Sequence, residues 1–205
     1  MSANILSKEL LQRLYIEKKM SSVDIGKIQG CSEHKVNYWI RKYNIPKRSI
    51  AEALYTKHNP AGDPFLLKHI KNLEDAKLLG IGLGLYWGEG NKKNVNSVKL
   101  GNTDPNMIRI FIKFLVELMG VKVAKLRFGL QIFSDLKKST VLNFWLNSLK
   151  KFGIVREQFY KVTTTLARSI GTYREKSQYG VLTVYVHNIK LKKIFDNLIA
   201  DVAQW

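Results

Sequence analysis

The feature that most limits how this chain can fold is a cluster of helix-breaking residues, NPAGDP, at positions 59–64. Proline lacks a backbone donor and clashes with the preceding turn, and glycine weakens a helix, so no regular helix can run through this stretch. The segment before it has helical patterns only, whereas the longer segment after it mixes helical and strand periods. We therefore expect a domain over residues 1–46, a linker over residues 47–72 and a second domain over residues 73–205.

Both parts of the chain are basic. The chain has 34 Lys and Arg residues against 16 Asp and Glu residues, a formal net charge of +18, and residues 1–60 contribute 11 of the basic and 5 of the acidic residues. Positive charge spread over folded segments predicts a polyanionic partner, most often nucleic acid and less often a membrane surface. A ribosomal or histone-like protein is the alternative, but such proteins usually carry their charge in disordered arms.

The sequence also limits redox chemistry and location. Cys31 is the only cysteine, which excludes a disulfide within the chain and a thiolate metal cluster. The opening residues lack the apolar core of a signal peptide, and the most apolar stretch, residues 78–87, is too short to span a bilayer. We expect no membrane partner and a cytoplasmic protein, associated with the nucleoid when it is bound to DNA.

Three short helical patterns occupy the first domain. One covers residues 7–18, the second follows Ser22, and the third, EHKVNYWIRKYN, begins after Ser32 and ends before Pro46. Two helices joined by a glycine-containing turn, the second basic on its outer side, are typical of a helix-turn-helix DNA-binding domain. A plain three-helix bundle is the alternative. The candidate DNA contacts are Lys35, Asn37, Tyr38 and Arg41, with Arg48 of the linker on the phosphate backbone.

The second domain alternates helical and strand patterns. Helical spacing is expected over residues 73–90, 105–120, 139–152 and 190–204, and strand alternation over residues 97–102, 121–133, 157–165 and 180–187. Asp104 can cap the second of these helices, with Pro105 at its first position. The pattern predicts an α+β fold whose curved antiparallel sheet has one apolar and one basic face.

Glycines recur every four residues in the helix expected over residues 73–90. Each interior glycine costs about 0.5–1 kcal/mol relative to alanine, and a stripe without side chains lets another backbone approach closely. We expect this helix to pair with the same helix of a second copy. Packing inside the chain, with a glycine-rich helix end, is the alternative. The expected interface residues are Gly80, Leu83, Gly84, Trp87 and Gly88.

The stretch GLGLYWGEG, residues 82–90, resembles the signature of the LAGLIDADG homing endonuclease family. Gly84 matches the internal glycine of the signature, Glu89 its final acidic residue and Gly90 the glycine that follows. LGNTDPNMIRIFIKFL is similar to the strand, turn and helix that come next in the family, and QFYK with YGVLTVYV resembles the closing strands of single-signature members that bear a helix-turn-helix. The resemblance covers roughly residues 73–202 and implies an αββαββα saddle beside an N-terminal all-α helix-turn-helix domain.

The resemblance implies site-specific, metal-dependent cleavage of double-stranded DNA by a homodimer. Glu89 of each chain, with the backbone of Gly88, would bind Mg²⁺ or Mn²⁺ between the scissile phosphates, and Lys99 and Gln131 are the candidates for positioning water and stabilising charge. A non-catalytic transcriptional regulator of the same fold is the alternative, because Trp87 stands where the family often has its first acidic residue. Binding of structured RNA is a third possibility.

Further DNA contacts are expected on exposed strand positions, which can read bases, and on basic loop residues, which can hold phosphates. The candidates are Lys92, Lys93, Lys99, Lys125, Arg127, Gln131, Lys161, Thr163, Arg168, Arg174, Lys176, Tyr185 and His187.

Overall fold

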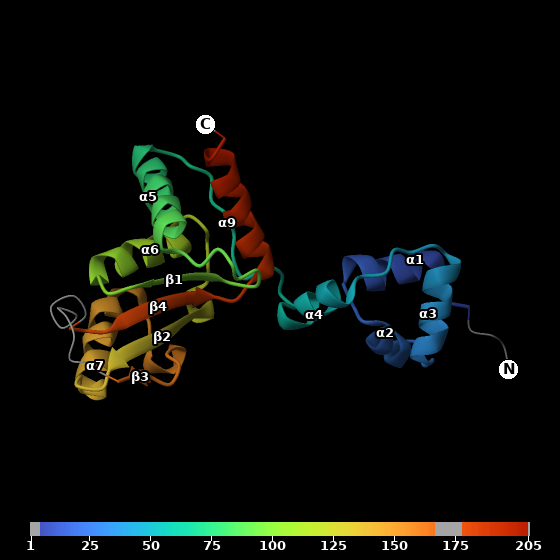
Figure 1. Cartoon of the computed structure of the whole chain (residues 1–205). Coiled ribbons are helices and arrows are strands. Elements are labelled where there is room, and N and C mark those ends of the chain that lie inside the picture. Colours follow the sequence, from blue (N-terminus) through green and yellow to red (C-terminus); the bar gives the residue numbers. More distant parts are fainter. Residues whose placement is uncertain (1–4, 167–177, 205) are drawn as a thin grey trace. The chain divides into compact units, whose positions relative to one another are not determined.

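The computed structural model describes residues 5–166 and 178–204. The chain forms two compact units, Met1–Asp63 and Pro64–Trp205 (Figure 1). Residues 64–72, which the sequence pattern places in the linker, belong to the second unit. They are held there because the backbone N–H groups of Leu66 and Lys68 donate hydrogen bonds to the carbonyls of Gly120 and Leu118.

The first unit is helical. Its elements are α1 (Lys8–Leu11), which continues as a π-helix η1 (Gln12–Glu17), then α2 (Ser22–Ile28), α3 (Glu33–Lys42) and α4 (Ile50–His58). Serine side chains at positions 7, 21, 32 and 49 accept the backbone N–H three residues further on, which explains where the α-helices begin. The cap of α2 is Ser21, one residue before the serine expected. A small core centred on Leu11, Ile25, Val36 and Ile40 holds α1, α2 and α3 together.

The second unit mixes helices and strands. Its elements are α5 (Leu73–Glu89), β1 (Val98–Asn102), α6 (Pro105–Glu117), η2 (Val123–Lys125), β2 (Leu126–Phe133), α7 (Lys138–Leu149), η3 (Lys150–Phe152), η4 (Arg156–Gln158), β3 (Thr163–Thr165), β4 (Val181–Val186) and α9 (Ile189–Val202). The α+β class expected from the sequence is confirmed. The Asp104 side chain caps α6, and Pro105 stands in its first turn, as predicted.

The sheet has the strand order β1-β4-β2-β3. β4 runs antiparallel to both β1 and β2, but β3 is parallel to β2. The expectation of a wholly antiparallel sheet is therefore wrong, because α7 lies between β2 and β3 and such a crossover returns the chain in the same direction. In the described ranges α6 also separates β1 from β2, so the element order is not the αββαββα that the family resemblance implies.

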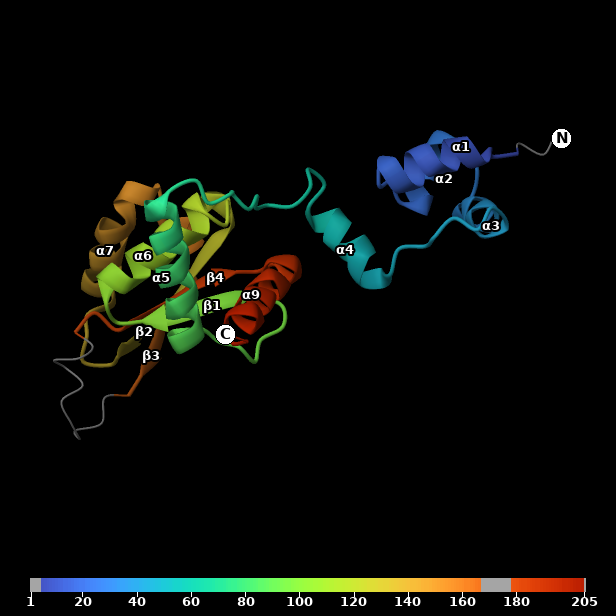
Figure 2. The same ribbon diagram turned by 90° about the horizontal axis from the view of Figure 1, so that it is seen from above.

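One face of the sheet is covered by helices. α6 and α7 lie on that side in both views (Figures 1 and 2), and their side chains form one core with the inward residues of the strands. Trp145, Phe111 and Phe114 of the helices are fully buried there, as are Leu126 and Phe128 of β2. α5 packs against α6, α9 and β1, which places its C-terminal end beside the edge strand.

Candidate nucleic-acid interface

The opposite face of the sheet is polar, and we call it the polar sheet face. Side chains alternate across a strand, so the buried residues of β1, β2 and β4 leave every second residue on this face. The strand register aligns Lys99, Tyr185 and Arg127 in one row across three strands. The face is formed by Lys99, Gly101, Arg127, Gly129, Gln131, Thr163, Thr165, Thr183, Tyr185 and, just beyond β4, His187, together with the half-buried Phe133 and Val181 at its far end.

Two cations stand in this row. The Lys99 Nζ lies 5.4 Å from the ring centroid of Tyr185. The Arg127 Nη1 donates to the carbonyls of Ala124 and Leu126 at 2.7 and 2.8 Å, which anchors one end of the guanidinium. Arginine has five donors in a planar fork, so this anchoring leaves donors that can meet a phosphate.

Two glycines lie in the middle of the polar sheet face. Gly101 and Gly129 lie on either side of Thr183 in the register. A Cβ at Gly129 would stand 3.0 Å from Cε2 of Tyr185, so the missing side chain makes room for the tyrosine ring to lean across the sheet. A Cβ at Gly101 would stand 2.9 Å from the Thr183 Oγ1. The space above each glycine is therefore filled by a side chain of β4.

The far edge of this face is held by a side-chain hydrogen bond. The Gln131 Nε2 donates to the Thr165 Oγ1 at 2.9 Å, linking β2 to the short strand β3. Thr163 is paired with Gln131 and is exposed. The two candidate DNA contacts Gln131 and Thr163 therefore lie side by side on the polar sheet face.

The C-terminal end of α5 is attached to the edge strand β1. Gly90 forms an antiparallel bridge with Leu100, and the Asn91 N–H donates to the Lys99 carbonyl at 3.0 Å. Because the Leu100 side chain is buried, its neighbours in β1 point to the polar sheet face. Glu89, which is exposed, lies opposite Gly101 in the register of that bridge. The structure thus brings the predicted residues Glu89 and Lys99 to one edge of the polar sheet face.

Glu89 makes no hydrogen bond or ion pair with the residues that the structure describes. A carboxylate at a helix C-terminus is disfavoured by the negative end of the helix dipole. The Lys92 ammonium donates a hydrogen bond to the Trp87 carbonyl and offsets part of this negative charge. Gly88 offers only its backbone carbonyl, which lies in the last turn and has no partner within the helix. Over residues 5–166 and 178–204, no group of three or more His, Cys, Asp or Glu residues could hold a metal.

The glycine stripe of α5 faces solvent. A Cβ added at Gly80, Gly84 or Gly88 would meet no heavy atom within 4 Å. By contrast, a Cβ at Gly82 would stand 2.2 Å from the Phe114 ring. Packing within the chain therefore requires Gly82 and does not require the stripe. Trp87, Ile81 and Leu73 are also exposed on this helix, so its outer side is largely apolar.

Leu83 does not belong to that outer side. Only 8% of its surface is exposed, and it packs in the core of the second unit. Its assignment to a dimer interface is wrong because its side chain packs in the core, about 100° around the helix from Gly84.

The four candidates on α3 do not share one side of the helix. Tyr38 and Arg41 are exposed, but Asn37 is half-buried and its amide donates to the Glu33 Oε1 at 3.3 Å. Lys35 lies about 160° around the helix from Asn37, since each residue turns by about 100°. Sequence reasoning missed Lys42, which is exposed and has its Nζ 4.7 Å from the Trp39 ring centroid. The basic end of the helix pattern was its only signal.

Arg48 has a structural role. Its guanidinium donates to the backbone carbonyls of Lys19, at 2.7 Å, and Met20, and it lies 4.4 Å from the Tyr15 ring centroid. The expectation that Arg48 follows a phosphate backbone is therefore wrong, because its donors close the loop between η1 and α2.

The remaining candidates are scattered. Lys125 lies in η2, outside the strand that was expected to include it, and Lys161 precedes β3. Lys92 and Lys93 lie in the exposed loop after α5. Arg168, Arg174 and Lys176 lie outside the described residues.

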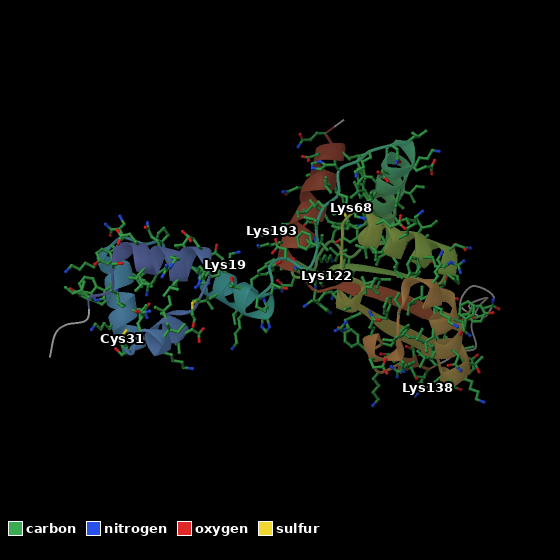
Figure 3. All side chains as sticks on the ribbon, turned by 180° about the vertical axis from the view of Figure 1, so that it is seen from behind. Lys19, Cys31, Lys68, Lys122, Lys138 and Lys193 are labelled. Carbon is green, nitrogen blue, oxygen red and sulfur yellow. The ribbon has the colours of Figure 1, made fainter. Side chains whose placement is uncertain are left out.

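Positive charge is not confined to the polar sheet face. Figure 3 shows Lys138 on α7 and Lys193 on α9, and both side chains are exposed. Net charge alone therefore does not locate a site, whereas the polar sheet face combines cations, hydrogen-bonding side chains and a helix-free surface.

Comparison with known proteins gives no match: no protein-family model, curated protein or solved structure is significantly similar to this chain. Within the described ranges, no helix combines the length and the apolar content needed to cross a membrane.

Proposed function

We propose that this protein binds a specific double-stranded DNA site with both of its units, and that a homodimer of it cleaves the DNA as a LAGLIDADG-like endonuclease. The observation that carries the proposal is the polar sheet face, where Lys99 and Arg127 flank Tyr185 on the side of the sheet opposite the apolar core. Nucleic-acid binding needs cations for phosphates together with hydrogen-bonding groups for base edges. The polar sheet face supplies both kinds.

Each part of the polar sheet face has a role in this proposal. Lys99 and Arg127 meet phosphates, because ammonium and guanidinium groups bind them without regard to sequence. Gln131 and Thr163 meet base edges in the major groove, where amide and hydroxyl groups can distinguish base pairs. Tyr38 and Arg41 on α3 extend the contact to a neighbouring part of the DNA site.

The open stripe of α5 supports the homodimer. Gly80, Gly84 and Gly88 face solvent with no atom within 4 Å of an added Cβ, and exposed Ile81 and Trp87 border them. Apolar helix surface that is bare of side chains is suited to close helix–helix contact. In such a pair the two C-terminal ends of α5 would carry Glu89 of both chains toward the DNA.

Glu89 supports the cleavage step. Carboxylate oxygen suits Mg²⁺ or Mn²⁺, but one chain supplies a single carboxylate and does not by itself fit a metal. Glu89 of both chains together would complete the donor set. A metal held there supplies Lewis-acid stabilisation of phosphate charge and an activated water. Lys99, at the same edge, stabilises negative charge on the phosphate, and Gln131 orients the DNA.

A DNA-binding regulator that does not cleave is the alternative. It is favoured by Trp87, which stands two residues before Glu89, and by Glu89 being a single carboxylate among the described residues at this edge. Both functions share the same DNA contacts and differ only in what Glu89 does.

Binding is tested with DNA selected from a random duplex pool. We expect Lys99→Ala with Arg127→Ala to weaken binding and to reduce the salt slope of the affinity by roughly 2, since each phosphate contact contributes about 0.9. The control is Lys138→Ala with Lys193→Ala, which removes the same charge elsewhere. Equal losses in the two double variants would contradict the assignment of the polar sheet face.

Cleavage is tested with plasmid DNA that carries the selected site, in the presence of Mg²⁺ or Mn²⁺. An endonuclease should nick or cut it, and Glu89→Gln should keep the binding affinity while abolishing cleavage. Glu74→Gln, at the other end of α5, is the matched control. Wild-type protein that binds the site and leaves it intact would establish the regulator instead.

A further inference from the structure

We propose that Tyr160 positions His187 so that the imidazole presents an N–H donor to the DNA, which makes this pair exclude cytosine at one position of the site. This inference rests on the proposed DNA binding and adds a specificity-determining pair to it. Tyr160 was not among the residues expected from the sequence.

His187 has one direction in which its side chain can point. It lies between Val186, which closes β4 and is buried, and Asn188, which is buried and caps α9 by accepting the Leu191 N–H at 2.9 Å. Because both neighbours are held on the core side, the exposed imidazole stands on the polar sheet face. It stacks at 5.7 Å and 21° against Tyr185.

The position of Tyr160 is fixed by contacts of the segment before β3 with β2. Its backbone N–H donates to the Phe128 carbonyl at 2.8 Å, and the preceding Phe159 is buried and stacks on Phe128 at 4.9 Å. With Phe159 in the core, Tyr160 points to the polar sheet face. Two residues separate Phe128 from Gln131 in β2, whereas three separate their partners Phe159 and Thr163, so the chain bulges between Phe159 and Thr163.

The two side chains meet through one hydrogen bond. The Tyr160 Oη lies 2.8 Å from the His187 Nε2, and the Tyr160 ring is set edge-on to Tyr185. The other ring nitrogen, Nδ1, makes no hydrogen bond with any residue in the described part of the chain. Tyr160 therefore occupies Nε2 and leaves Nδ1 for a ligand.

Burial and the nearby positive charges favour the neutral form of the imidazole. The groups that face it are Tyr160, Tyr185, Lys99 and Arg127. Burial first, and then the positive charges of Lys99 and Arg127, lower the pKa of His187 from its ordinary value of 6.5. A neutral imidazole has one N–H and one lone pair. If the Tyr160 hydroxyl donates to Nε2, the proton of the ring is on Nδ1.

An Nδ1–H of His187 at this place can donate a hydrogen bond to an acceptor atom on a base edge. In the major groove guanine, adenine and thymine each present an acceptor, whereas cytosine presents only its N4 donor. A fixed Nδ1–H donor facing cytosine would leave two donors opposed, so that base is rejected. Lys99 and Arg127 are taken by phosphates in this arrangement, and the neutral ring supplies the sequence information.

The experiment compares Tyr160→Phe with the wild-type chain on the selected DNA site and on variants with cytosine at each position. At neutral pH we expect the wild type to bind one cytosine variant about 5- to 150-fold more weakly, the range for one good base contact. Tyr160→Phe keeps the ring but frees Nε2, so either nitrogen can carry the proton and this discrimination disappears. Tyr179→Phe, which removes a hydroxyl on the core side of the sheet, should change nothing.

Acid supplies the readout that a merely structural role would not give. Once the pH falls below the lowered pKa of His187, the imidazolium donates from both nitrogens whether or not Tyr160 is present. Tyr160→Phe should then regain the exclusion of cytosine, whereas His187→Ala should lack it at every pH. Discrimination that survives Tyr160→Phe at neutral pH, or that acid does not restore, would overturn the proposal. Failure of the wild type to bind DNA, or unchanged DNA binding by Lys99→Ala with Arg127→Ala, would instead refute the proposed function itself.

Discussion

Two glycines in the same helix should respond to alanine in opposite directions. Gly84 and Gly82 are two residues apart in α5, and neither has a positive φ. At Gly84 an added Cβ meets open space, while at Gly82 it stands 2.2 Å from the Phe114 ring, which is fully buried. The chemistry of the substitution is therefore the same, and only the surroundings differ.

The magnitudes follow from these surroundings. Gly84→Ala should raise the free energy of unfolding by about 0.5–1 kcal/mol, because alanine loses less backbone entropy in a helix. Gly82→Ala gains the same term but pays for overpacking, about 1–3 kcal/mol. Since the contact is far inside van der Waals distance and Phe114 cannot move into solvent, we expect a net loss of about 2 kcal/mol. The two variants should thus differ by about 3 kcal/mol.

The assay is urea unfolding followed by circular dichroism, at protein concentrations low enough to keep the chain monomeric. A second measurement addresses the partner helix. Gly84→Leu should leave the monomer folded, since the space is open, but should abolish dimers in sedimentation equilibrium because the backbones can no longer approach. Destabilisation of the monomer by Gly84→Ala would refute the reasoning, since it would mean that the stripe is covered within the folded chain.

Two further predictions concern groups with a structural role. Arg48→Ala should destabilise the first unit by about 2–3 kcal/mol in urea unfolding, because it removes charged hydrogen bonds to the carbonyls of Lys19 and Met20, whereas Lys47→Ala, next to it and exposed, should be neutral. Burial, and to a lesser extent the charge of Asp196, raises the pKa of Tyr86 from 10.0 to about 12. The folded chain therefore holds this proton more tightly than the unfolded chain, and stability should fall as pH rises from 10 to 12. The free energy of unfolding, measured from pH 10 to 12, should include this decrease in the wild type and lack it in Tyr86→Phe.

Much of the local structure followed from the sequence. Serine caps and the break at Asn59 to Pro64 are short-range signals, and Asp104 with Pro105 marked the start of α6 correctly. Strand alternation assigned Lys99, Arg127, Gln131 and Tyr185 to one face, because side chains on a strand point to alternate sides whatever the sheet order is. Helical spacing was less reliable for Leu83, since a stripe of glycines does not show which of its borders is buried.

Pairings between distant segments could not be predicted in this way. The parallel alignment of β3 with β2 depends on the α7 crossover, and the hydrogen bond from Tyr160 to His187 joins residues 27 positions apart. Nothing in the sequence distinguishes Arg48 from the other basic residues of the linker, and only the fold shows its hydrogen bonds to the carbonyls of Lys19 and Met20. These contacts depend on how elements pack, and no periodicity within a single segment records that.

The sequence by itself determined the positions of the helices to within a few residues, the basic character of both units and the glycine spacing of α5, because capping, charge and periodicity act over a few residues. Only the tertiary structure decided which glycines are free. The space beside Gly82 is filled by the Phe114 ring of α6, whereas Gly80, Gly84 and Gly88 face solvent. It also decided that Glu89 lies at the edge of the polar sheet face, since the bridge between Gly90 and Leu100 holds the end of the helix against β1. Both results depend on which surfaces come into contact when helices and strands pack.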